Sequence, residues 1–289
     1  MKSAIAIIDR AFEHGPAALA CSGGTDSMIL LDLVFAHTDH RPPVVYLDNG
    51  LDYPETRQFL IEACAHYGAS LHVAEPRREP KIQWERQGWP MLGKINANKW
   101  TARHPDAGFR LNCSACCQVL KIKPARDLTK SLGCKVQLTG NRGGAEARIR
   151  GRWMLEDAIR WNKQDKLWIA APLCGWTNLG VNIYTRHHGL LQHPARRRGA
   201  ESIGCIPCGG GCQWDNSGFK FMRKIEPALW HKYMVDWRMG EIVLAIKHDK
   251  PLALVQEAVG KLGGLESLAE TQPWIFDCTL KTPLKGTAK

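Results

Sequence analysis

Residues 17–34 read AALACSGGTDSMILLDLV, and this stretch decides the fold. An apolar run precedes the glycine turn Ser22-Gly23-Gly24-Thr25-Asp26-Ser27, and a second apolar run begins at Met28. The order predicts a buried strand, a tight turn and the start of a helix. Glycines let a ligand approach the backbone closely, and hydroxyls beside helix N–H groups favour an anion. The alternative is a plain strand-to-helix turn in which Ser and Asp cap the helix.

The composition is that of an ordinary globular protein. The chain has 289 residues, of which 44% are hydrophobic and 23% charged, enough for one large α/β domain with an appendage. No stretch approaches the length of a membrane span, and the N-terminus lacks the layout of a signal peptide. We therefore expect a cytoplasmic protein with no membrane partner.

The net charge of +11 comes from basic residues that scatter along the chain. Their densest run is Arg196-Arg197-Arg198. It fits a basic pocket for an anionic nucleotide, a polynucleotide groove or a solvated surface.

Strands and helices alternate over the first part of the chain. Apolar runs predict short buried strands at 17–21, 43–47, 70–74, 134–138 and 167–171. Helical spacing is found at 2–13, 27–37, 54–67 and 117–132. This alternation predicts an α/β fold with a doubly wound parallel sheet that binds ligands at the carboxyl ends of its strands. After residue 176 the chain is rich in Gly, Pro, Arg and Cys, and helical stretches follow at 221–240 and 251–270. We therefore expect a nucleotide-binding domain over 1–200 and a cysteine-bearing helical region over 201–289.

The chain has 11 cysteines, which in a cytoplasmic protein do not indicate a disulfide framework. Cys21, Cys64, Cys134 and Cys174 stand alone in apolar surroundings and are expected to be buried. The others gather mainly in two groups, Cys113/Cys116/Cys117 and Cys205/Cys208/Cys212. Cys116-Cys117 and the C-x-x-C of Cys205 and Cys208 together offer four soft ligands. They suit one tetrahedral zinc or one 4Fe–4S cluster, and either pair alone could be a zinc half-site or chance.

A second ligand loop follows the strand expected at 43–47 and reads LDNGLDYPET from Leu47. The Asp48 carboxylate at a strand end can hold ribose hydroxyls, and Gly50 leaves room for an adenine. The alternative is an Asx turn between strand and helix.

These motifs resemble known families. The glycine turn is similar to the pyrophosphate-loop signature of the adenine nucleotide α-hydrolase superfamily, which includes ATP pyrophosphatases and sulfonucleotide reductases. Within it, four further blocks resemble the reductases that act on phosphoadenylyl sulfate (PAPS) or adenylyl sulfate (APS), and the match spans about residues 17–210. The blocks are the loop at 48–56 (with Asn49 for the usual Thr), Cys116-Cys117 with Lys121 and Pro124, Thr139-Gly140-Asn141-Arg142, and Trp176-Thr177 with the run from Gly199 to Cys208.

The resemblance implies a role for each block. Cys116, Cys117, Cys205 and Cys208 would hold a 4Fe–4S cluster beside the nucleotide. The glycine turn would cradle a phosphate or sulfate, and Asp48 and Gly50 would hold ribose and adenine. The block of Thr139, Gly140 and Arg142 would hold the sulfate and phosphate ends, where Lys121 and Arg142 would neutralise the sulfate. Glu146, Arg148 and Arg150 also resemble this block but are shifted by about one position.

The family's catalytic cysteine has only an outline equivalent here. Reductases end in E-C-G-L/I-H, whereas this chain has Asp277-Cys278-Thr279-Leu280-Lys281, further from the C-x-x-C than in the family. If the match holds, Cys278 attacks sulfur, and thioredoxin or glutaredoxin releases sulfite from the resulting S-sulfocysteine. Alternatively Cys278 is an incidental tail cysteine, and Cys113 or Cys212 replaces a ligand or acts as a separate redox thiol.

A second functional hypothesis comes from the other branch of the superfamily. The full S-G-G-x-D-S loop, the positive charge and the spare cysteines also suit an ATP pyrophosphatase that activates tRNA or DNA for sulfur insertion. Against it, the sequence contains no recognisable nucleic-acid-binding module. A nucleotide-binding redox sensor is a third possibility.

Overall fold

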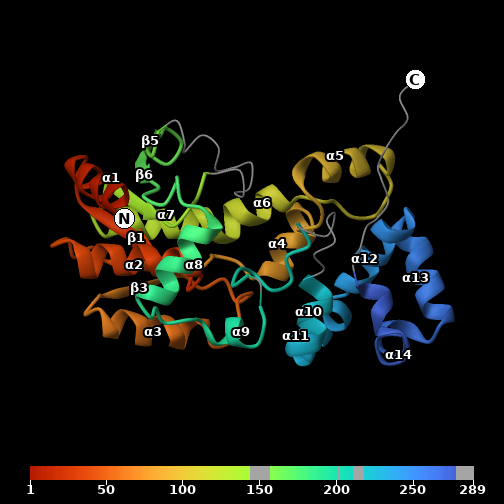
Figure 1. Cartoon of the computed structure of the whole chain (residues 1–289). Coiled ribbons are helices and arrows are strands. Elements are labelled where there is room, and N and C mark those ends of the chain that lie inside the picture. Colours follow the sequence, from red (N-terminus) through yellow and green to blue (C-terminus); the bar gives the residue numbers. More distant parts are fainter. Residues whose placement is uncertain (144–156, 201, 211–217, 278–289) are drawn as a thin grey trace, which may run out of the picture. The chain divides into compact units, whose positions relative to one another are not determined.

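The computed structural model describes residues 1–143, 157–200, 202–210 and 218–277. The chain divides into two compact units (Figure 1). Unit 1 comprises Met1–Arg77 and Lys121–Gly204, and unit 2 comprises Arg78–Leu120 and Cys205–Lys289. None of the helices in the described residues is both long and apolar enough to cross a membrane.

Unit 1 is built on a six-stranded sheet with the order β3-β2-β1-β4-β6-β5. The strands are β1 (Ala17–Ala20), β2 (Val44–Leu47), β3 (Leu71–Ala74), β4 (Val136–Thr139), β5 (Ile159–Asn162) and β6 (Leu167–Ala170). Neighbouring strands are parallel, except that β5 runs antiparallel to β6. The expected α/β class and the five expected strands are confirmed.

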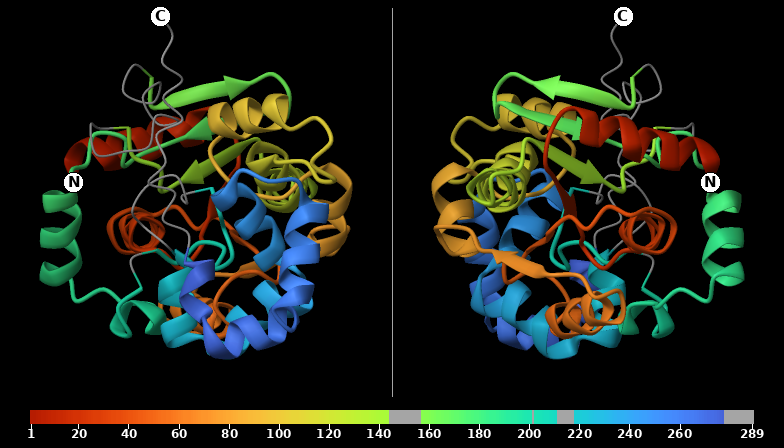
Figure 2. Two further views of the ribbon diagram at one scale, coloured as in Figure 1. Left: turned by 90° about the vertical axis from the view of Figure 1, so that its right-hand side faces the viewer. Right: turned by 90° about the vertical axis from the view of Figure 1, so that its left-hand side faces the viewer.

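Helices cover both faces of this sheet and can be followed in Figures 1 and 2. On one face a large core joins alternate strand residues, such as Leu19, Tyr46 and Leu138, to α1, α2, α3 and α8. On the other face Ala18 and Val45 contact the region of α7. The helices of unit 1 are α1 (Lys2–Glu13), α2 (Thr25–His37), α3 (Thr56–His66), α7 (Lys123–Ser131), α8 (Asn178–His187) and α9 (Pro194–Arg197).

Two features of unit 1 differ from the sequence-based expectation. Strand β5 was missed because it lies at the sheet edge with Arg160 and Trp161 exposed, so its residues form no apolar run. The helix expected at 117–132 is divided into a π-helical turn η1 (Gln118–Ile122) and α7. Of the isolated cysteines, three are buried as expected, but Cys174 is only half-buried.

Unit 2 is helical. Its elements are α4 (Pro80–Gln87), α5 (Lys94–Arg103), α6 (Cys113–Cys117), α10 (Gly218–Ile225), α11 (Pro227–His231), the π-helical η3 (Lys232–Asp236), α12 (Met239–His248), α13 (Leu252–Lys261), α14 (Gly264–Thr271) and the 3-10 turn η4 (Pro273–Phe276). Large aromatic side chains fill its interior, among them Trp84, Trp100, Phe219, Tyr233 and Phe276.

Backbone breaks divide the two long helical stretches expected in this region. Pro227 starts α11, because proline fits the first turn of a helix but not its interior. Arg238 has φ of 59° and separates η3 from α12. Gly263, with φ of 85°, separates α13 from α14, so the stretch expected at 251–270 is two helices.

Candidate functional site

The glycine turn presents uncapped backbone N–H groups. Gly23 adopts the left-handed φ of 73°, and Gly24, at the N-cap of α2, offers no capping side chain. Ser27 Oγ donates to the Gly24 carbonyl at 2.8 Å and accepts from the Ser22 N–H at 3.3 Å. Its hydroxyl thus fixes the turn rather than capping the helix. The first N–H groups of α2 are therefore positioned to bind an anion.

Gly140 holds the end of β4 against the same helix terminus. Strands β1 and β4 are neighbours, with Ala20 opposite Thr139. A Cβ on Gly140 would lie 2.9 Å from the backbone C and O of Asp26 and from the N of Ser27. Only glycine permits this approach, so Gly140 serves the packing of the loop. The contact lies where the strand order reverses, between β1 and β4, which is where open α/β sheets bind ligands.

Arg142 supplies a positive charge beside the helix terminus. Its Nε donates to Asp26 Oδ2 at 3.1 Å, and an NH1 group donates to Asn178 Oδ1 at 2.8 Å. Asp26 thus orients an arginine instead of capping α2. The structure brings together Ser22, Asp26, Ser27, Gly140 and Arg142 from two separate segments.

A pocket opens directly on the glycine turn. It is lined by Gly23, Thr25, Met28, Thr185, Leu190, Leu191, Gln192, His193 and Arg196. Arg196 donates from NH1 to the Ala200 carbonyl at 3.1 Å, while its buried Nε has no partner among the described residues. The run of three arginines was the sequence signal for this group.

His193 is a pocket residue that the sequence did not reveal. Its Nδ1 accepts the Ala195 N–H at 3.1 Å, so its Nε2 carries the proton and donates to Thr56 Oγ1 at 3.0 Å. Burial lowers the pKa of His193 and keeps the ring neutral. A lone histidine carries no distinctive spacing, which is why no pattern pointed to it.

The second ligand loop is an Asx turn, as the alternative interpretation predicted. Asp48 Oδ1 accepts the Gly50 N–H at 3.1 Å, and the buried Asn49 accepts the Leu51 N–H at 2.9 Å. Asp48 Oδ2 lies 3.6 Å from an Arg57 nitrogen. Gly50 has φ of 70° with open space around its Cβ position. Asp48 and Gly50 remain predicted ligand contacts.

Asp52 is a second residue that sequence reasoning missed. Burial raises the pKa of its carboxyl to about 6, against the opposing effects of the Lys121 charge and a hydrogen bond from Tyr46. The Tyr46 hydroxyl lies 3.2 Å from Asp52 Oδ2. The structure thus places the predicted Lys121 within the electrostatic reach of a partly buried carboxyl of unit 1.

Unit 2 brings the two cysteine groups together. Cys113 begins α6, whose N-cap residue Asn112 accepts the Ala115 N–H at 3.0 Å. The buried Cys113 thiol interacts with Cys117 and Cys208. Cys116 lies within electrostatic reach of Cys117, Cys205 and Cys208. A Cβ on Gly210 would lie 2.8 Å from Cys113 Sγ and 3.5 Å from Cys208 Sγ, so glycine is needed where the segments meet.

The five thiols form a site that suits a thiophilic metal centre. Burial raises the pKa of Cys116 to about 12, and neighbouring cysteines add to this effect, whereas a hydrogen bond from Trp84 Nε1 at 3.2 Å opposes it. These raised pKa values favour neutral thiols, and a bound metal cation would favour the thiolate form. The all-sulfur donor set fits both iron–sulfur and zinc chemistry, and an N–H···S bond such as that of Trp84 tunes iron–sulfur centres.

Several predicted residues lie outside the described part of the chain. They are Cys278, which was predicted to be the nucleophile, and Cys212, Glu146, Arg148 and Arg150. Their roles remain predictions.

Comparison with known proteins identifies the family of this chain. The family model "Phosphoadenosine phosphosulfate reductase domain" matches residues 16–211. An adenosine 5′-phosphosulfate reductase from Oceanobacillus iheyensis is 27% identical over 65% of this chain and 69% of its own length. A phosphoadenosine 5′-phosphosulfate reductase from Xylella fastidiosa is 27% identical over 68% of this chain and 74% of its own length. A crystal structure of phosphoadenylyl-sulfate reductase from Candida auris aligns with a TM-score of 0.49 and 18% identity, over 70% of this chain and 88% of that one. With the family model covering well over half of its length, this chain belongs to the phosphoadenosine phosphosulfate reductase family.

Proposed function

We propose that this protein is a sulfonucleotide reductase that forms sulfite from APS or PAPS in a thiol-dependent reaction. A cysteine thiolate attacks the sulfur of the substrate, an S–S bond forms, and the S–O bond to the nucleotide breaks. The adenosine phosphate leaves as the product. A dithiol protein of the thioredoxin or glutaredoxin class then reduces the S-sulfocysteine, which releases sulfite and leaves that dithiol as a disulfide.

The observation that carries the proposal is the pairing of two sites in one chain of this family. Unit 1 has an uncapped helix terminus with Arg142 beside it, which suits the anionic end of a nucleotide. Unit 2 has five thiols gathered from two distant segments. Nucleotide hydrolysis alone does not require such a set of soft ligands.

Within unit 1 we propose the roles that the family resemblance implies, supported by charge and position. Ser22, Gly23, Gly24, Thr25, Asp26 and Ser27 form the phosphate or sulfate cradle, and Thr139 and Gly140 close it. Arg142 and Arg196 compensate the negative charge, since both guanidinium groups lie beside this turn. Lys121 neutralises the sulfate, and Asp48 and Gly50 hold ribose and adenine.

Within unit 2 we propose that Cys116, Cys117, Cys205 and Cys208 hold a 4Fe–4S cluster. When bound, the iron of such a cluster would compensate the negative charge of the four thiolates that hold it. Trp84 orients Cys116 through its N–H···S bond. Cys113 packs against this set as a fifth, buried thiol.

The function is tested by assaying anaerobically purified full-length protein on three substrates in parallel. We expect sulfite from APS or PAPS with thioredoxin as reductant, and no pyrophosphate from ATP. Cys278→Ser should abolish sulfite formation, because only a thiolate accepts the sulfo group, whereas Cys174→Ser should keep it. Mass spectrometry without reductant should find the sulfo adduct on the Cys278 peptide. An adduct on Cys113 or Cys212 would identify that cysteine, and not Cys278, as the nucleophile. Pyrophosphate release from ATP with no adduct on any cysteine would contradict the reductase proposal.

The cluster is tested by metal analysis. We expect about four irons and matching sulfide per chain, with broad thiolate-to-iron absorption. Cys116→Ser and Cys205→Ser should each lose most of the iron, because one of four thiolate ligands is missing. Cys174→Ser is the matched control, as this half-buried cysteine belongs to unit 1. One equivalent of zinc without iron or sulfide would identify a zinc site instead.

The role of Gly140 is tested by adding one methyl group. Gly140→Ala places a Cβ against the backbone of Asp26 and Ser27, so the turn must shift. We expect the affinity for APS, measured by calorimetry, to fall by about tenfold or more, which corresponds to ~1.4 kcal/mol. Gly260→Ala is the control, because this position in α13 has open space for a Cβ. Unchanged affinity in a folded Gly140→Ala protein would refute the cradle described above.

The raised pKa of Asp52 predicts that the free energy of unfolding depends on pH. Its folded pKa of about 6 lies above the usual value of an aspartate, so the folded state binds a proton that the unfolded state has lost. This contribution favours folding at low pH and is lost as the pH rises from about 4 to about 6. In urea unfolding, Asp52→Asn should therefore gain stability relative to the parent between pH 5 and pH 7.5. The exposed Asp39→Asn should show no such change, and equal behaviour of both variants would contradict the assignment.

A further inference from the structure

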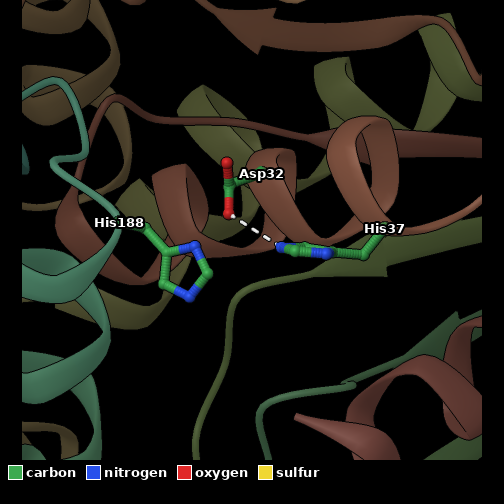
Figure 3. A group of neighbouring side chains, drawn as sticks. All are labelled: Asp32, His37 and His188. Carbon is green, nitrogen blue, oxygen red and sulfur yellow. Dashed lines mark ion pairs between the residues drawn. The ribbon is translucent and has the colours of Figure 1, made fainter.

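A group of three metal-ligating side chains lies at the far end of α2 from the glycine turn. Asp32 and His37 belong to α2, and His188 directly follows α8 (Figure 3). Helix α2 has 13 residues, and with a rise of about 1.5 Å per residue its ends lie roughly 18 Å apart. On the same scale Asp32 lies roughly 10 Å along the helix from Thr25, so the group is not part of the first turn of α2.

Asp32 is a buried carboxylate that two tyrosines hold in place. The Tyr184 hydroxyl donates to Oδ2 at 2.6 Å, and the Tyr67 hydroxyl donates to Oδ1 at 2.9 Å. The carboxylate is thus oriented like a ligand that outer hydrogen bonds hold in position.

His37 has an unsatisfied nitrogen aimed at this carboxylate. Its Nε2 lies 3.7 Å from Asp32 Oδ2 and, although buried, makes no hydrogen bond with any described residue. A buried polar atom left without a hydrogen bond destabilises the folded state. Because this buried nitrogen makes no hydrogen bond with a described residue, it is available to a ligand that the described chain does not supply.

His188 completes the group from a different element. Its ring stacks on Tyr184 with centroids 4.0 Å apart and stands at 88° to the ring of His37. One ligand atom from each of Asp32, His37 and His188 lies within 4.8 Å of the others. Because bonds from such ligands to zinc are about 2 Å long, atoms on a common ion lie roughly 3–4 Å apart. The ligand atoms would therefore need to approach one another by up to about 1 Å to share an ion.

The electrostatics of the group also favour a cation. His37 is the last residue of α2, and His188 is the C-cap of α8. Helix C-termini carry partial negative charge and stabilise cations near them. In the described part of the chain the ion-pair partner of Asp32 is His37, so no fixed positive charge from lysine or arginine already neutralises the carboxylate.

We propose that Asp32, His37 and His188 form a second metal site that is distinct from the cysteines. Two imidazole nitrogens and one carboxylate oxygen suit a divalent ion of the zinc, cobalt or nickel class, with water in the remaining position. The ion ties the C-terminus of α2 to that of α8. Its role is structural, because its three ligands join two separate helices.

Cobalt titration of the full-length protein tests the proposal, because the spectrum separates the two kinds of site. Cobalt bound to cysteines shows intense sulfur-to-metal charge-transfer bands, whereas cobalt on nitrogen and oxygen shows only weak visible bands. We expect one cobalt without charge-transfer bands in the parent. His188→Ala should weaken that binding by at least about tenfold, since a ligand is lost. His187→Ala, which removes the neighbouring histidine outside the group, should leave it unchanged.

A second variant distinguishes the loss of a metal ligand from a folding defect. His37→Gln keeps a polar side chain at the end of α2 and should show the same loss of cobalt. Circular dichroism establishes that each variant is folded. The proposal is overturned if all bound cobalt shows charge-transfer bands, or if His188→Ala and His37→Gln bind cobalt as the parent does.

Discussion

The close approach of Gly140 to the first turn of α2 is the constraint on which unit 1 depends. A Cβ at this position would lie 2.9 Å from three backbone atoms of Asp26 and Ser27. The contact clamps the end of β4 to the glycine turn and brings Arg142 into hydrogen-bond reach of Asp26. The uncapped N–H groups, the arginine and the pocket with Arg196 thus meet at one edge of the sheet.

In unit 2 the corresponding constraint is the gathering of five cysteine thiols, most of them at least partly buried. Five thiols approach one another in a partly dry environment, where each additional negative charge would raise the pKa of the others. Trp84 donates one N–H···S bond to Cys116. Gly210 leaves room for Cys113 and Cys208 because it has no Cβ. A sulfur-bound metal centre would compensate such charges, which is why we propose that the cysteines hold a cofactor rather than serve packing alone.

In the proposed scheme the two ends of helix α2 bind groups of opposite charge. Its N-terminus, with partial positive charge, faces the nucleotide anion, and its C-terminus, with partial negative charge, carries the Asp32, His37 and His188 group. The same helix dipole therefore supports an anion at one end and a cation at the other. Buried apolar residues between them, from Met28 to Leu31, anchor the helix in the core.

The sequence by itself determined the α/β class, five of the six strands of the sheet and the glycine turn, because short apolar runs and glycines act over a few neighbouring residues. It also indicated the cysteine groups and the basic run that contains Arg196. Only the tertiary structure decided that Gly140 serves backbone packing, that Asp26 binds Arg142 and that Cys113 joins the other thiols. The edge strand β5, the neutral His193, the raised pKa of Asp52 and the pairing of His37 with His188 likewise depend on residues distant in the chain. Burial and long-range contact are properties of the folded chain, and local spacing does not encode them.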